Sequence, residues 1–456
     1  MNLRLLRWFI LKLLLGGTVL LVYHKRVGLS DPNGMLVARL LMRPDLWFGL
    51  AVLLAMVVMT RRCLVAVNRS PSATKALSIG PWLALATGIL GSLVGWWRYG
   101  VGMSDFGIQE SARMVLCTLL VMLVYNFSIF RPRFASSMWQ LLVAMPALNV
   151  IFALGVLLLP SLVQTIFGAS MLDEGDGLFS FGARYQGLTS NPNMVASSSC
   201  IAFALLLPSL RRELLILSPR AIGITLYAIG LVGVIGMSGV RSMALALPIL
   251  VAVDFWLSFR LTERGMTRLI FAGVTMGAVA LFGAALLWRA GTADVMLERF
   301  ESGDGRLFLW KIYIRTLLEN PLGLGFGFES IVHADEIIVG QRLPPHNTLL
   351  QMSMYGGLPG LFVHLGVLGV MIGVILHLRY TDHRIWVPLR IQSLILGWLA
   401  SVMTLFFSGM IFIDFYYALL SALLLAEVGR YRLRLYQTRI NNSSPDYAPY
   451  INERII

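Results

Sequence analysis

Residues 344–378 read PPHNTLLQMSMYGGLPGLFVHLGVLGVMIGVILHL, and this stretch decides the fold. From residue 348 to residue 378 it contains no Asp, Glu, Lys or Arg. An uncharged apolar run of this length is typical of a transmembrane helix. Lipid offers the backbone no hydrogen-bond partners, so such a run has to be helical. The stretch therefore predicts a membrane span that begins directly after His346 and Asn347.

The rest of the 456-residue chain repeats this apolar pattern. Hydrophobic residues make up 57% of it and charged residues 13%, whereas a soluble domain carries about 25% charged residues. We therefore predict an all-α polytopic integral membrane protein with about twelve transmembrane helices. The expected spans are residues 5–23, 46–60, 77–97, 114–130, 138–167, 194–210, 221–237, 242–259, 269–288, 348–378, 386–408 and 410–428.

The basic residues predict the orientation of these spans. The net charge is +14, but the excess collects in alternate short loops, as in the cytoplasmic loops of membrane proteins. This distribution argues against nucleic-acid binding. It places both termini in the cytoplasm and most acidic residues outside. One outer loop does not follow the rule, because it holds Lys25, Arg26, Arg39 and Arg43.

The spans divide the chain into four regions. Residues 1–288 should form nine helices with short loops and an outer loop at 168–193. Residues 289–347 should form a large outer loop with amphipathic helices. Residues 348–440 should hold three more spans, and residues 441–456 a polar cytoplasmic tail.

The large outer loop contains one clear helix signal. Asp304 can cap a helix that Asn320-Pro321 ends. Its apolar face is predicted to comprise Leu307, Trp310, Ile314 and Leu317. A glycine-rich turn follows, and then a shorter helix at about 328–339.

His346 is the first candidate for chemistry. Pro344 and Pro345 stiffen the approach to it at the predicted membrane–water boundary. An imidazole can accept a proton near neutral pH, so His346 is a candidate general base. The alternative is a structural turn residue at a helix start. Asn347 can cap the helix that follows.

Four arginines lie on the outer side, where the positive-inside rule disfavours them: Arg184, Arg241, Arg306 and Arg315. A guanidinium pairs bidentately with phosphate, so these residues could clamp a phosphate or pyrophosphate. The alternative is pairing with nearby acids or contact with lipid headgroups. Asp414, between the last two spans, can pair with one of these arginines.

No metal or cofactor is predicted. The acidic stretch Asp173–Asp176 lacks the spacing of a ligand set and has no nearby histidine. Cys63, Cys117 and Cys200 fall in or beside apolar runs without paired spacing, so we interpret them as core thiols. The chain has no phosphate-binding loop, dinucleotide fingerprint or nucleophile elbow.

Taken together, these residues resemble the bacterial O-antigen ligase family within a broader ligase/polymerase superfamily. That family carries a His followed by Asn, Ser or Gln, then nine residues, Gly, two residues, and Gly, Thr or Val. Here the motif runs from His346-Asn347 through Gly357 to Gly360. Gly305-Arg306 with Trp310 resembles the superfamily's loop signature, as do Asn320-Pro321 with its following glycines, Arg184 with Gly187, and Ser238–Arg241.

The resemblance implies a GT-C-like, metal-independent, inverting membrane glycosyltransferase. Its donor would be an O-antigen glycan on undecaprenyl pyrophosphate, and its acceptor a sugar hydroxyl of lipid A–core. Transfer would occur at the periplasmic face of the bacterial inner membrane, among membrane lipids. His346 would be the catalytic base, and Arg184, Arg241 and Arg306 would bind the pyrophosphate. Further candidates are Arg315, Asn347, Asp414 and Trp310.

Two alternatives remain open. An O-antigen polymerase or a protein O-oligosaccharyltransferase of the same superfamily would use the same chemistry on another acceptor. A polytopic transporter of an anionic solute would use the arginines as a binding site. A transporter would be expected to place charges or broken helices in the middle of the membrane.

Overall fold

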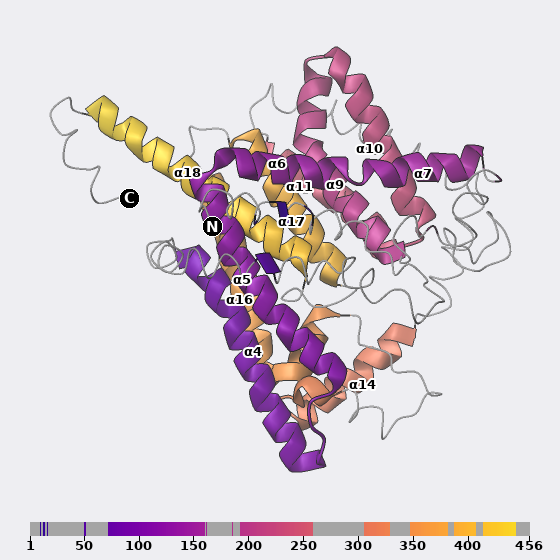
Figure 1. Cartoon of the computed structure of the whole chain (residues 1–456), viewed down its shortest axis with the longest axis vertical. Coiled ribbons are helices and arrows are strands. Elements are labelled where there is room, and N and C mark those ends of the chain that lie inside the picture. Colours follow the sequence, from indigo (N-terminus) through magenta and orange to yellow (C-terminus); the bar gives the residue numbers. More distant parts are fainter. Residues whose placement is uncertain are drawn as a thin grey trace.

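The computed structural model describes residues 72–159, 192–258, 305–328, 347–381, 387–406 and 414–443, with single positions at 10, 12, 13, 16, 50, 51, 161 and 185. The described part is built from helices (Figure 1). They are α4 (Ser72–Tyr99), α5 (Asp105–Phe130), α6 (Pro132–Ala144), α7 (Ala147–Leu158), α9 (Pro192–Leu215), α10 (Pro219–Met237), α11 (Arg241–Ser258), α14 (Gly305–Glu319), the 3-10 helix η2 (Gly325–Gly327), α16 (Thr348–Thr381), α17 (Leu389–Phe406) and α18 (Phe415–Ser443).

Six segments of the described part are long and apolar enough to cross a membrane. They are Ala73–Tyr99, Gly107–Phe130, Pro132–Leu158, Pro192–Leu215, Pro219–Met237 and Thr348–Arg379, and two shorter apolar helices are Leu245–Ser258 and Leu389–Leu405. The prediction of a polytopic helical membrane protein is therefore confirmed. The predicted spans 5–23, 46–60 and 269–288 lie outside the described ranges, so the total of twelve stays a prediction.

Helix α4 packs against α16, and the part of α16 that follows Gly357 runs antiparallel to it. Gly80 faces Val367 near one end of the pair, and Gly91 faces the carbonyl of Tyr355 near the other. Glycine at these points lets the two backbones approach closely. The C-terminal part of α4 and the kink of α16 at Gly357 consequently lie at the same end of the bundle.

That end also holds residues 100–104 and the glycine-rich turn 321–328, and we call it the loop end. The opposite end is held by a buried polar cluster. Arg211 donates from Nε to Asp254 Oδ2 (2.7 Å) and from Nη2 to Gln392 Oε1 (2.9 Å). This cluster joins the C-terminal parts of α9 and α11 to the start of α17.

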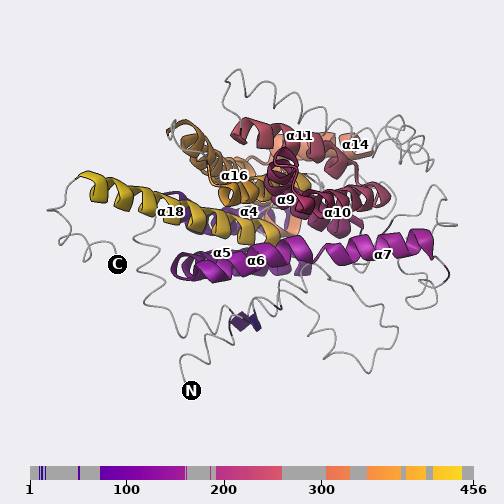
Figure 2. The same cartoon turned by 90° about the horizontal axis from the view of Figure 1, so that it is seen from above.

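Three boundaries differ from the sequence prediction. The expected span 138–167 is divided into α6 and α7 by a turn at Met145-Pro146, because proline lacks the N–H that would continue the helix. Figures 1 and 2 show α6 and α7 following each other in nearly one line. Helix α5 begins at Asp105 instead of residue 114, because its first turns are polar and capped by Ser104. Helix α18 continues to Ser443, past the predicted span end at residue 428 and into the predicted polar tail.

Candidate functional site at the loop end

The glycine-rich turn is tied to three helices at the loop end. Phe326 donates its N–H to Ser92 Oγ of α4 (2.9 Å) and accepts at its carbonyl from Ser104 Oγ (2.9 Å), which caps α5. Leu324 N–H donates to the carbonyl of Met354 in α16 (2.8 Å). The turn thus links the large loop to the spans α4, α5 and α16.

Glycine is required at two points of this junction. Gly325 has φ +75°, and a Cβ there would collide with the backbone of Ser92. Gly357 has φ +62° and ψ −153°, which kinks α16. At that kink Leu358 N–H donates to the carbonyl of Pro321 (2.8 Å). Gly325 therefore allows the turn to contact α4, and Gly357 allows it to contact α16.

An aromatic cluster anchors α14 to this junction. Tyr313, Phe326, Phe328 and Tyr355 are each 1% exposed. The ring centroids of Tyr313 and Phe328 are 6.0 Å apart, and those of Phe328 and Tyr355 are 5.2 Å apart. Burial of these rings holds α14 against the first half of α16.

The predicted apolar face of α14 is wrong at Ile314, which is 48% exposed. Tyr313 is the fully buried side chain of this helix, and Leu317 is partly buried; the side chain of Leu307 lies outside the described part. The prediction placed aliphatic residues in the core. In the structure, Phe328 of the distant glycine-rich turn packs against Tyr313, so Tyr313 is the buried residue. Trp310, on the same side of the helix, is partly buried. The predicted end of the helix agrees with the structure, since α14 ends at Glu319 directly before Asn320-Pro321.

Asn347 caps α16, as the sequence predicts. Its Oδ1 accepts from the N–H groups of Leu349 (2.9 Å) and Leu350 (3.2 Å). Thr348 Oγ1 donates to the carbonyl of Leu405 (2.8 Å), which fixes the same turn to the end of α17. His346 itself lies outside the described residues. Its neighbour in sequence is the helix cap Asn347, which is 7% exposed and makes the two hydrogen bonds given above.

One turn further along α16, Gln351 meets a buried carboxyl group, that of Glu110 in α5, which sequence reasoning missed. Gln351 Nε2 donates to Glu110 Oε1 (3.2 Å) and to the hydroxyl of Tyr355 (3.2 Å). Glu110 is 2% exposed and Gln351 4%. The available signal was an acidic residue close to a span start, in a chain with few charges. This network joins the head of α5 to the first turns of α16.

The starts of α11 and α16 both lie near the end of α17. Ser258, the last residue of α11, donates from Oγ to Gln392 near the start of α17 (3.2 Å), and the two helices pack along each other in opposite directions. At about 1.5 Å per residue, Arg241 is about 25 Å along α11 from Ser258. Leu405 is about 20 Å along α17 from Gln392, and it bonds Thr348. The backbone of Arg241 therefore reaches the level of the α16 cap.

The structure describes the other candidate arginines only in part. Tyr185, the neighbour of Arg184 in sequence, donates its N–H to the carbonyl of Met237 (3.1 Å), just before the turn that leads to Arg241. Arg184 lies outside the described residues, as do the side chains of Arg241 and Arg306, so their convergence stays a prediction. Arg306 is the second residue of α14. Arg315 has an exposed side chain that pairs with Glu319 (3.1 Å), the local ion pair that the sequence left open.

Asp414 lies at the start of α18. Its Oδ1 accepts from the N–H of Tyr417 (2.8 Å), so the carboxylate serves as a helix cap. Asp414 and Arg113 are both close enough to Cys117 for their charges to act on that thiol. This places Asp414 beside the middle of α5. In the part of the chain that the structure describes, no group of three His, Cys, Asp or Glu residues could hold a metal ion.

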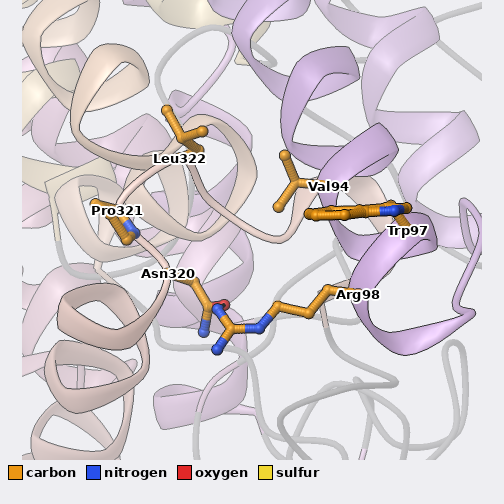
Figure 3. Close-up of a pocket in the computed structure, with 6 residues that line it drawn as sticks. All are labelled: Val94, Trp97, Arg98, Asn320, Pro321 and Leu322. Atoms are coloured by element: carbon orange, nitrogen blue, oxygen red, sulfur yellow. Dashed lines mark hydrogen bonds between the residues drawn. The ribbon is translucent and has the colours of Figure 1, made fainter.

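Arg98 is a second residue that sequence reasoning missed, although it directly follows Trp96-Trp97 at the end of a predicted span. Its Nη1 donates to Asn320 Oδ1 (2.8 Å) and to the carbonyl of Glu319 (3.2 Å). The hydroxyl of Tyr99 also donates to Asn320 Oδ1 (3.1 Å). Figure 3 shows Arg98 reaching from α4 to the turn after α14, beside a cavity.

The fold and this polar end define a polytopic membrane protein whose loop end gathers hydrogen-bonded polar residues between several spans. Residues 226–365 match the family model Wzy_C, described as O-antigen ligase. This match confirms the resemblance seen in the sequence and places the segment in the O-antigen ligase family. A comparison with curated proteins found no match to the chain.

Proposed function

We propose that this protein is an O-antigen ligase. It transfers an O-antigen glycan from undecaprenyl pyrophosphate to a sugar hydroxyl of lipid A–core, at the periplasmic face of the inner membrane. The observation that carries the proposal is the complete motif from His346 to Gly360, at the head of a span and inside the segment that matches the family. The capped first turn of α16 gives His346 a rigid attachment point.

In the proposed reaction, the acceptor hydroxyl oxygen attacks the anomeric carbon of the donor glycan. His346 takes the hydroxyl proton, which makes a weak nucleophile competent. The new carbon–oxygen bond forms as the bond to the pyrophosphate oxygen breaks, with inversion at the anomeric carbon. The pyrophosphate leaves as an anion and remains on the undecaprenyl lipid. No nucleotide or metal takes part.

The leaving group gains negative charge as its bond breaks, and arginines can offset that charge. Arg184, Arg241 and Arg306 are proposed to do so. Support comes from the backbone: Tyr185 bonds next to the turn that leads to Arg241, and the start of α11 is level with the cap of α16. The buried hydrogen bond from Gln351 to Glu110 stabilises the same first turns of α16.

The experiment is deletion of the chain's coding sequence in its own host, followed by electrophoresis of lipopolysaccharide. We expect complete core without attached O-antigen, together with accumulation of lipid-linked polymer. Loss of polymer itself, with single repeats still attached to core, would indicate a polymerase instead. An unchanged lipopolysaccharide pattern with loss of glycans from protein would indicate a protein O-oligosaccharyltransferase.

A further inference from the structure

A groove lies where α4 meets the turn after α14. It is a cavity of about 420 Å³ lined by Val94, Trp97, Arg98, Asn320, Pro321 and Leu322. In Figure 3, Val94 and Trp97 stand on α4, while Pro321 and Leu322 face them from the turn. One basic side chain thus lies among mostly apolar walls.

Arg98 is fixed in this groove by the turn. Its Nη1 donates two hydrogen bonds, one to Asn320 Oδ1 and one to the carbonyl of Glu319 at the end of α14. Within the described residues, Nε and Nη2 donate to no protein acceptor. Arg98 is therefore a pre-positioned cation with donors left for an anion, and a guanidinium suits phosphate oxygens.

An apolar stripe runs from the groove along α4. Leu83, Leu90, Leu93 and Trp97 are 49%, 46%, 59% and 83% exposed, and their spacing puts them on one side of the helix. This helix is one of the candidate membrane spans. A hydrocarbon chain lying along the stripe would bring its headgroup to Arg98 at the end of the span.

We propose that this groove docks the polyprenyl pyrophosphate of the donor as it enters from the membrane. The inference rests on the proposed function and names the place where that lipid first binds. The isoprenoid chain lies along the stripe on α4, and the pyrophosphate contacts Arg98. A glycan-bearing polyprenyl pyrophosphate carries two negative charges beside its lipid chain, which matches a cation at the end of an apolar stripe.

The position of the groove supports the donor over bulk phospholipid. Its far wall, Pro321-Leu322, is the segment whose carbonyl bonds Leu358 at the kink of α16. The kink lies one short stretch of helix after the capped turn at Asn347. A lipid held at Arg98 therefore contacts the same turn that supports the proposed site, while Arg98 itself takes no part in the chemistry.

The test is photo-crosslinking of the full-length protein in phosphatidylcholine nanodiscs with a diazirine-bearing undecaprenyl pyrophosphate. We expect labelled peptides from α4 near Trp97 or from the turn at Leu322. Arg98→Gln should weaken labelling about tenfold, as expected for the loss of a hydrogen bond to a charged group. Arg133→Gln is the matched control, an exposed arginine at the opposite end of the bundle, and should label like wild type.

Trp97→Ala provides a second variant, since this side chain is 83% exposed and its loss should leave the fold intact. It should also reduce labelling. Unlabelled undecaprenyl pyrophosphate should compete, whereas an excess of phosphatidylglycerol should not. Equal competition by phosphatidylglycerol would overturn the proposal, because the groove would then be a general lipid contact. Unchanged labelling of Arg98→Gln would overturn it as well.

The crosslink is read without any glycan transfer, so the two proposals fail separately. Arg98-dependent labelling in a protein that attaches no O-antigen would refute only the ligase function. Transfer without Arg98-dependent labelling would refute only the docking groove. In kinetic assays, Arg98→Gln should raise the KM for donor and leave kcat unchanged. A fall in kcat alone would contradict a docking role.

Discussion

The cap at Asn347 provides a quantitative test of how α16 supports the proposed base. Asn347→Ala removes the acceptor for two N–H groups, those of Leu349 and Leu350. Losing such a cap costs about 1 kcal/mol, and up to about 2 kcal/mol. A change of this size alters a conformational equilibrium by a factor of about 5–30. Because His346 is bonded directly to Asn347, we expect transfer per folded molecule to fall by a similar factor.

The assay pairs thermal unfolding of the purified protein with a transfer measurement normalised to folded protein. Asn347→Ser keeps a short capping oxygen and should retain most activity. Ser104→Ala is the matched control, because Ser104 caps α5, a helix that contacts the first turns of α16 through Glu110. It should lower stability to a similar extent and leave normalised transfer near wild type. Wild-type transfer by Asn347→Ala, or an equal loss in Ser104→Ala, would refute the reasoning.

Three further predictions concern the arginines, metals and the glycine-rich turn. Replacing Arg241 or Arg306 by Lys keeps the charge but loses the bidentate fork, so transfer should fall about tenfold, and Ala should cost about a hundredfold; wild-type kinetics in the Ala variants would remove them from the clamp. Purified protein treated with a chelator should keep full activity, and a loss that a divalent ion restores would show that a metal takes part. Gly325→Ala should destabilise the protein by at least about 2 kcal/mol, because left-handed backbone strain adds to a collision with Ser92; an unchanged melting temperature would contradict the close packing of the turn.

Sequence periodicity predicted the elements whose signals are local. Uncharged runs gave the spans that became α4, α9, α10 and α16. Asn320-Pro321 predicted the end of α14, and Asn347 predicted a helix cap, because both signals act within one turn of the chain. The position of α14's buried face was wrong because it depends on Phe328 and Tyr355, which are supplied by other segments.

The parts that could not be predicted depend on contacts distant in sequence. Arg98 meets Asn320 across 222 residues, and Glu110 meets Gln351 across 241. Arg98 and Glu110 are charged residues beside predicted spans, but nothing near either in sequence indicates its distant partner. Only the antiparallel packing of α4 and α16 and the junction at the glycine-rich turn bring these pairs together.

Reconstituted transfer with purified protein tests the central claim most directly. The assay combines undecaprenyl-pyrophosphate-linked O-antigen, lipid A–core and either wild-type protein or His346→Ala in nanodiscs, without nucleotide or added metal. The wild-type protein should form O-antigen-bearing lipopolysaccharide and release undecaprenyl pyrophosphate. His346→Ala, folded to the same extent, should form neither product. Glycan elongation without attachment to lipid A–core, or normal transfer by His346→Ala, would contradict the account.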